Sequence, residues 1–129
     1  MEIFSNPTQN PLGNNYDKYT KAIGSMMEKM GMEVQYISVP QERLNEVAPD
    51  GMGLPRINVV GTLEGKSARP NIHFTGHYDV VPEGENWSHH PYGCDIEDGK
   101  IYARGSSDQK SGIVCKLLPS RHCKKQAFS

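Results

Sequence analysis

Two short motifs contain residues that could hold a divalent metal ion. His77 and Asp79 stand two positions apart at the end of an apolar stretch, and Asp108 follows in a Gly- and Ser-rich stretch. An imidazole is a neutral nitrogen donor suited to zinc, and a carboxylate can bridge two cations and offset their charge. In an extended segment, side chains two apart point the same way, so His77 could face a metal while Asp79 accepts the ring's other N–H. The alternative is a structural histidine bonded to a neighbouring acid.

Other candidate residues have weaker claims to chemistry. His89 and His90 lie in a Pro-flanked loop, where a solvated pair is favoured over a metal site. Glu83 and Glu85 are interpreted as exposed loop acids rather than catalytic groups. Cys115 falls in a predicted helix without a partnering base, so we expect a buried structural thiol.

The elements that must position these residues follow from hydrophobic periodicity and turn signals. Apolar residues spaced three and four apart predict a helix over 15–30, whose stripe is interpreted as core rather than as a Met-rich binding face. Alternation predicts strands at 33–39, 56–63 and 70–76, with the polar stretch 40–55 as a surface loop. A hairpin with arms 94–97 and 100–103 is predicted around Asp98-Gly99. A final helix is predicted at 111–118, ended by Pro119. The fold class expected is α/β, a partial mixed β-sheet with flanking helices.

Composition places further limits on the function. The chain has 129 residues, enough for one modest domain, and 14 Lys+Arg balance 15 Asp+Glu, so we expect no nucleic-acid partner. There is no secretory signal and no apolar run of membrane-spanning length, so no membrane association is expected. Three cysteines without a C-x-x-C pair favour reduced thiols and a cytoplasmic location.

Several stretches in order resemble one family of two-zinc metallohydrolases, which includes aminoacylase, acetylornithine deacetylase, succinyl-diaminopimelate desuccinylase and glutamate carboxypeptidase. The resemblance runs from about residue 5 to 118. It is carried by the opening Asn6-Pro7-Thr8-Gln9-Asn10-Pro11-Leu12-Gly13, by Gly76-His77-Tyr78-Asp79-Val80-Val81-Pro82, by Trp87 with Pro91-Tyr92, and by Asp98-Gly99-Lys100-Ile101-Tyr102-Ala103-Arg104-Gly105-Ser106-Ser107-Asp108-Gln109-Lys110-Ser111-Gly112. Ala103 stands where a glycine is common, a mild departure.

The resemblance implies a role for each candidate residue. His77 would ligate one metal, Asp79 would orient it as part of the catalytic machinery, and Asp108 would bridge two zinc ions, with cobalt as a possible substitute. A strained peptide bond would follow the bridging Asp108, before Gln109. The chain would be the amino-terminal part of a zinc-exopeptidase-like catalytic domain over 1–118.

The end of the chain departs from the family pattern. Residues 119–129 resemble neither the family nor a core segment, and residues 109–129 contain no Asp or Glu. The family's Glu-Glu pair, its late histidine ligand and its lid domain, which usually carries dimer contacts, have no counterpart here. We therefore expect a truncated fragment that is inactive by itself.

The function expected of the family is metal-dependent hydrolysis of an amide or peptide bond. The substrate would be a small N-acyl amino acid, as for acetylornithine deacetylase and succinyl-diaminopimelate desuccinylase. Two alternatives stay open: an exopeptidase or dipeptidase of the same family, or a non-catalytic fragment with residual metal or partner binding.

Overall fold

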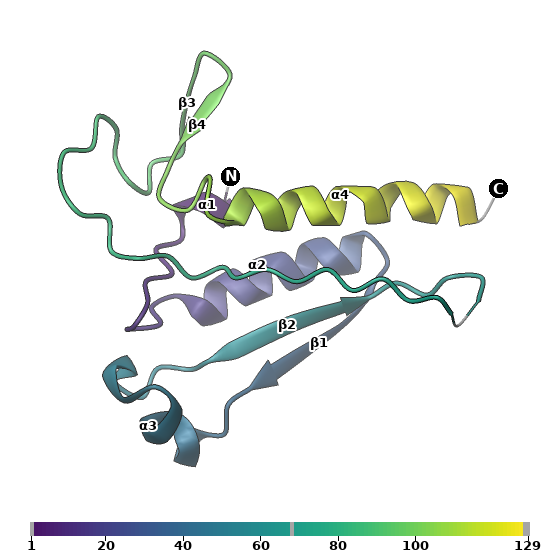
Figure 1. The fold of residues 1–129 in the computed structure, drawn as a ribbon, viewed down its shortest axis with the longest axis horizontal. Coiled ribbons are helices and arrows are strands. Elements are labelled where there is room, and N and C mark those ends of the chain that lie inside the picture. The colour runs from purple at the N-terminus through teal and green to yellow at the C-terminus, as the bar shows by residue number, and fades with distance from the viewer. Residues whose placement is uncertain (1, 68, 128–129) are drawn as a thin grey trace.

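The elements of the chain stack in layers. In the computed structural model, which describes residues 2–67 and 69–127, the C-terminal helix α4 (Lys110–Ala127) lies above helix α2 (Tyr16–Lys29). Helix α2 in turn covers a two-stranded sheet of β1 (Glu33–Ser38) and β2 (Ile57–Thr62) (Figure 1). A short helix, α1 (Glu2–Ser5), packs beside α2. The α/β fold class predicted from the sequence is confirmed.

Helix α2 buries its apolar stripe in the core, as the periodicity predicts. Tyr19 and Ile23 are buried and cluster with Ile3 of α1 and Leu117 of α4. The methionines of the stripe pack against this cluster, so they form core rather than an open binding face: Met26, Met27 and Met30. Asn15 precedes the helix in the left-handed conformation without a side-chain capping bond. The core thus joins both long helices.

Strands β1 and β2 pair antiparallel, from Glu33 opposite Thr62 to Ser38 opposite Ile57. The connection between them is more ordered than the predicted loop: it contains α3 (Leu44–Val47) between two 3-10 turns, at Gln41–Arg43 and Pro49–Gly51.

The strand predicted at 70–76 is wrong. This segment belongs to neither two-stranded sheet of the described residues, and all of its residues are exposed, including Ile72 at 80% and Phe74 at 59%. The alternation picked out residues that suit a pleated strand, but a strand also needs a backbone partner. Among the residues that the structure describes, β2 pairs only with β1. The expected three-stranded mixed sheet is therefore a two-stranded antiparallel one.

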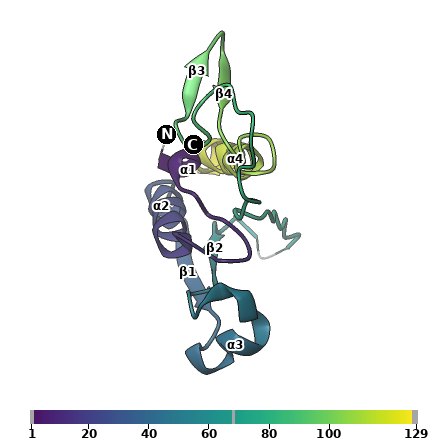
Figure 2. The same cartoon turned by 90° about the vertical axis from the view of Figure 1, so that its left-hand side faces the viewer.

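The predicted hairpin is confirmed as β3 (Asp95–Glu97) and β4 (Lys100–Tyr102), which project away from the helices (Figure 2). Asp98 and Gly99 both have positive φ, 49° and 73°. Two successive positive φ values fit the tight turn that Asp-Gly favours between antiparallel strands.

Pro119 does not end the last helix, contrary to the prediction. Helix α4 continues through it to Ala127. Proline removes one hydrogen bond to the carbonyl four residues earlier, which belongs to Cys115. Cys115 is an exposed residue, where a helix tolerates the loss of one such bond better than in the core, and the expectation of a buried thiol is also wrong.

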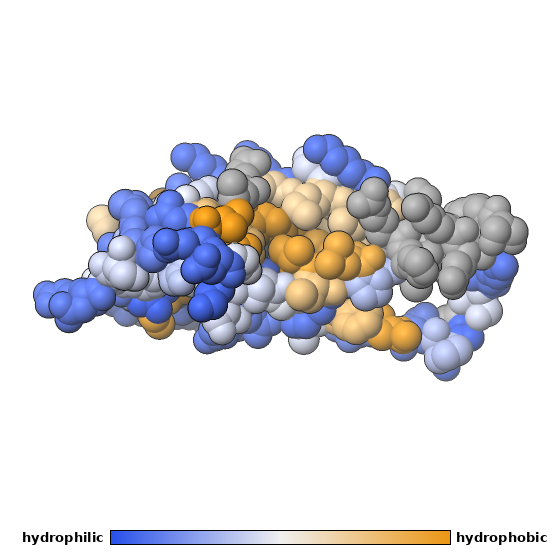
Figure 3. Space-filling model, turned by 90° about the horizontal axis from the view of Figure 1, so that it is seen from above, coloured by the Kyte–Doolittle hydropathy of each residue, from blue (hydrophilic) through white to orange (hydrophobic). Residues whose placement is uncertain are grey.

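The surface seen from the α4 side carries apolar side chains near the middle of the molecule (Figure 3). Leu118 is one of the large apolar residues with high exposure, at 55%.

Within residues 2–67 and 69–127, no helix has the length and apolar content needed to cross a bilayer.

Candidate metal centre

The segment that carries His77 is fixed by the amino-terminal stretch rather than by a sheet. Thr8 and Asn10 flank a parallel bridge between Gln9 and Val80. The Val80 N–H donates to the Thr8 carbonyl at 2.8 Å, and the Asn10 N–H donates to the Val80 carbonyl at 2.9 Å. The buried Thr8 hydroxyl donates to the Tyr78 carbonyl at 2.6 Å. Residues 78–80 are therefore held in a definite register.

Tyr78 anchors the same segment from the other side. Its ring packs against Tyr16 and Tyr19 of α2, with ring centroids 4.9 and 4.8 Å apart, and its hydroxyl donates to the Ile57 carbonyl at 2.6 Å. Burial raises the pKa of the Tyr78 phenol well above its usual value, so it is a neutral donor. His77 and Asp79, on either side of Tyr78, consequently face away from the core.

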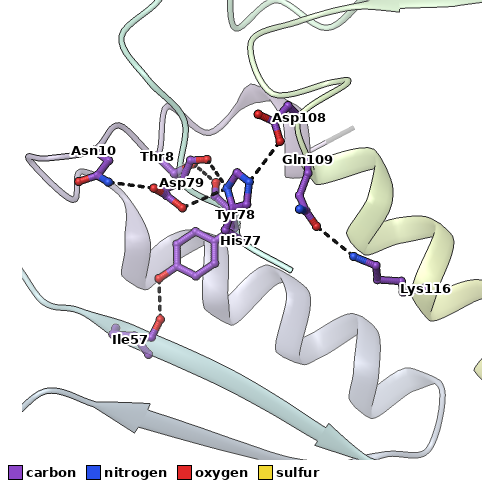
Figure 4. Close-up of polar contacts among 9 residues, drawn as sticks. All are labelled: Thr8, Asn10, Ile57, His77, Tyr78, Asp79, Asp108, Gln109 and Lys116. Carbon is purple, nitrogen blue, oxygen red and sulfur yellow. Dashed lines mark hydrogen bonds and ion pairs between the residues drawn. The ribbon is translucent and has the colours of Figure 1, made fainter. Parts of the chain in front are cut away.

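The His77 ring lies between two carboxylates (Figure 4). Its Nδ1 is 3.2 Å from Asp79 Oδ1 and also 3.2 Å from the Asp79 carbonyl oxygen. Its Nε2 is 3.2 Å from Asp108 Oδ1. If the Nδ1–H group donates a hydrogen bond to Asp79, the lone pair of Nε2 faces Asp108, which is the tautomer that a metal-ligating histidine requires.

Asp108 is presented by the turn that joins β4 to α4. The Lys110 N–H donates to the Gly105 carbonyl at 3.0 Å and closes this turn, and the Asp108–Gln109 peptide bond is cis. The resemblance implied an unusual peptide bond at this place. The Asp108 side chain is 86% exposed and that of His77 47%, so both can be reached from solvent.

The donor set fits a divalent cation in part. Two ligands about 2.0 to 2.1 Å from a tetrahedral zinc lie about 3.3 Å apart, close to the 3.2 Å between His77 Nε2 and Asp108 Oδ1. Catalytic zinc normally takes three protein ligands, however. Among residues 2–67 and 69–127 no group of three His, Cys, Asp or Glu side chains is arranged to hold a metal ion.

An open cavity of about 420 Å³ adjoins the two candidate ligands. Its wall includes His77, Asp108 and the side chains of Trp87 and Arg104. The Arg104 guanidinium lies over the Trp87 ring, 5.0 Å from its centroid, and donates to the Glu83 carbonyl at 2.6 Å. The loop after Asp79 is thereby tied to the turn that leads to Asp108.

The weaker candidates make local contacts away from His77. His89 stacks on Tyr102 and lies 3.2 Å from Glu97. The ring of His90 accepts a hydrogen bond from the Tyr92 N–H. Their interpretation as an ordinary loop pair is consistent with these contacts.

Glu83 is held by side chains rather than placed beside the candidate ligands. Its carboxylate accepts from Gln9 Nε2 at 2.6 Å and from the Tyr92 hydroxyl at 3.1 Å. Its own backbone N–H and then the Tyr92 hydroxyl hold the pKa of this carboxyl below its usual value. Glu83 therefore acts as a structural anion in this arrangement. Glu85 is exposed.

Sequence reasoning missed residues that support the site from a distance. Asn10 donates to Asp79 Oδ2 at 3.0 Å, and Lys110 is fully buried with its ammonium donating to the Asn6 carbonyl at 2.7 Å. Burial lowers the pKa of Lys110 to about 8. Both contacts involve the opening segment, whose resemblance to the family was the one available signal.

The chain shares sequence with a known hydrolase family. The model of Peptidase family M20/M25/M40 matches residues 73–127. Succinyl-diaminopimelate desuccinylase of Gluconobacter oxydans is 48% identical over 62 residues, 48% of this chain and 16% of the relative. The desuccinylase of Sulfurovum sp. is 44% identical over 57 residues, 44% of this chain and 16% of the relative. The chain thus matches about one sixth of the length of these relatives.

A solved structure has a similar fold. The M20 family metallo-carboxypeptidase Sso-CP2 from Sulfolobus solfataricus aligns with 97% of this chain and 26% of its own, with a TM-score of 0.63 at 20% identity. The sequence matches support the resemblance to M20-family hydrolases that the motifs indicated. The predicted boundary at 118 stays a prediction, and the family match extends past it to 127.

Proposed function

We propose that His77 and Asp108 are metal ligands of an M20-type amidohydrolase site and that Asp79 orients His77. The observation that carries the proposal is the 3.2 Å separation of His77 Nε2 from Asp108 Oδ1, with Asp79 at the opposite ring nitrogen. The ion is zinc, and cobalt can replace it because both accept nitrogen and oxygen ligands. When bound, such an ion would polarise an amide carbonyl and activate water.

The residues of the chain would each contribute a defined part. His77 would donate its Nε2 lone pair, and Asp79 would hold the proton on Nδ1 and raise the basicity of the ring. Asp108 would supply a carboxylate that can bridge two ions, as the family resemblance implies. The adjoining cavity, beside Trp87 and Arg104, is where a small substrate would lie.

The proposed substrate is a small N-acyl amino acid, cleaved at its amide bond. The similarity to succinyl-diaminopimelate desuccinylases of Gluconobacter and Sulfurovum favours this class. Exopeptidase or dipeptidase action is the second candidate, favoured by the fold match to a metallo-carboxypeptidase. A cytoplasmic location is proposed because Cys115 is an exposed free thiol, which a reducing compartment tolerates. Dimer formation would be a property of the longer family members.

The 129-residue chain by itself is proposed to bind zinc weakly and to turn over no substrate. Two ligands fall short of the usual three, and residues 109–129 supply no carboxylate to act as a general base. If the chain is instead non-catalytic and binds no metal at this place, the unaltered chain and its Asp108 variants will have the same zinc affinity.

The test combines an assay with calorimetry. The chain, with zinc or cobalt added, is incubated with succinyl-diaminopimelate, acetylornithine and simple dipeptides, and zinc binding is titrated in parallel. We expect no turnover and a zinc affinity about tenfold or more above that of Asp108→Ala, in line with the effect of losing site residues. Asp50→Ala, which removes an acid remote from the cavity, is the matched control. Turnover lost in Asp108→Ala would refute the claim of inactivity, and equal zinc affinity would refute the site.

A further inference from the structure

Asn10 makes a contact with the candidate site that the roles described above do not use. Its side-chain amide lies 3.0 Å from Asp79 Oδ2, while the other carboxylate oxygen of Asp79 faces His77 (Figure 4). A chain of three polar groups thus runs from Asn10 through Asp79 to the imidazole, and continues from the imidazole to Asp108.

The backbone around this contact is fixed on both sides. Asn10 donates its backbone N–H to the Val80 carbonyl, and Thr8 bonds both to Val80 and to the Tyr78 carbonyl. Residues 78 and 80 flank Asp79, so its Cα has a defined position relative to Asn10. The side-chain contact is therefore built on a rigid frame, although Asn10 itself is exposed.

The orientation of the Asn10 amide follows from chemistry. An ionised carboxylate only accepts hydrogen bonds, so the NH2 group rather than the amide oxygen must face Asp79. A carboxylate without this donor can rotate about its last side-chain torsion, which is broad and roughly two-fold. The donor at residue 10 therefore selects the rotation that keeps one oxygen on the Nδ1 side of His77.

We propose that Asn10 is a positioning residue for the metal centre, acting through Asp79 on His77. This inference rests on the proposed metal-binding function and deepens it. It assigns a role to the opening segment, which supplies no ligand of its own. The role requires a hydrogen-bond donor at residue 10 and an acceptor at residue 79 on the side that faces residue 10.

The test is a set of variants whose zinc affinity is measured by calorimetry. Asn10→Ala removes the donor, and Asn10→Asp keeps the shape but places one acceptor against another. The double variant, Asn10→Asp with Asp79→Asn, exchanges donor and acceptor. The new carboxylate at position 10 would then accept from the amide NH2 at position 79, whose amide oxygen would face His77. Asn71→Asp, at an exposed position, controls for the added charge.

We expect Asn10→Ala to weaken zinc binding about three- to tenfold, less than the 10–100-fold typical of a group that bonds a ligand directly. Asn10→Asp should weaken it more, and Asn71→Asp should change it little. The double variant should bind zinc more tightly than Asn10→Asp, because the hydrogen bond is restored. A purely steric role predicts instead that the isosteric Asn10→Asp is harmless, and that result would overturn the inference. A double variant that binds zinc no more tightly than Asn10→Asp would also overturn it.

A second readout needs no metal. The side-chain NH2 signal of Asn10 in the metal-free chain should shift on Asp79→Ala, while that of Asn71 should not. An unmoved Asn10 signal would overturn the inference whatever the zinc affinities. Equal zinc affinity of the unaltered chain and Asp108→Ala would overturn the proposed metal centre instead, and the Asn10 signal would still report whether the contact with Asp79 exists.

Discussion

Gly105 allows a sharp test of how the turn before Asp108 is positioned. Its φ is +83°, and a Cβ added to it would lie 2.7 Å from Val80 Cγ1, whereas Gly99 has φ of +73° with open space around it. Replacing either glycine by alanine places an L-residue in the left-handed conformation, which costs about 1–2 kcal/mol of stability. Only Gly105→Ala also forces a contact with a buried valine, which is stiff at χ1.

The expected loss is therefore unequal. Overpacking costs typically about 1–3 kcal/mol, so Gly105→Ala should lower the free energy of unfolding by about 2–5 kcal/mol and Gly99→Ala by about 1–2 kcal/mol. Urea denaturation of the unaltered chain and of the two variants gives the free energy of unfolding of each from its midpoint and slope. If the native state adapts by moving the turn, zinc affinity should fall in Gly105→Ala but not in Gly99→Ala.

Equal stability losses in the two variants would refute this reasoning. That result would mean that Val80 and the turn move apart freely, and that the backbone frame around Asp79 does not extend to Gly105. A change of slope in only one variant would instead indicate a changed denatured state, and the comparison would then rest on Gly105→Ser and Gly99→Ser.

Three further predictions concern the core that carries the site. Tyr78→Phe should cost about 1 kcal/mol in urea denaturation, because it removes the hydrogen bond to the Ile57 carbonyl. Ile23→Ala, at a residue 1% exposed, should cost about 2–5 kcal/mol and Ile23→Val about 0.5–1.5 kcal/mol. Burial raises the pKa of Tyr19 above its unfolded value of about 10. The neutral phenol therefore contributes fully to the free energy of unfolding below pH ~10, and this contribution is lost as the pH rises further. Tyr19→Phe should therefore make the alkaline loss of stability shallower, and a loss as steep as that of the unaltered chain would contradict it.

Local signals predicted the elements whose causes are local. The stripe of Tyr19 and Ile23 determines helix α2 because a 3.6-residue period leaves one apolar face to bury. Asp98-Gly99 determines the hairpin because both residues tolerate positive φ. These elements were predictable because their determinants lie within a few residues.

Long-range partners could not be predicted in the same way. Ile72 and Phe74 have the alternation of a strand, but nothing in that pattern reveals whether a backbone partner is present. Pro119 removes one helical hydrogen bond, yet proline can kink a helix without ending it, and α4 continues through it. At the candidate site, residue type, spacing and the family resemblance pointed to His77, Asp79 and Asp108, whereas the contact of Asn10 depends on the bridge between Gln9 and Val80.

The most direct test of the metal centre is the 15N NMR signal of the His77 ring during a zinc titration. We expect the Nε2 signal of His77 to shift on zinc binding while Nδ1–H continues to donate to Asp79. Asp108→Asn should weaken the zinc affinity measured from this shift about tenfold or more. Zinc-induced shifts at His89 or His90, with His77 unchanged, would contradict it.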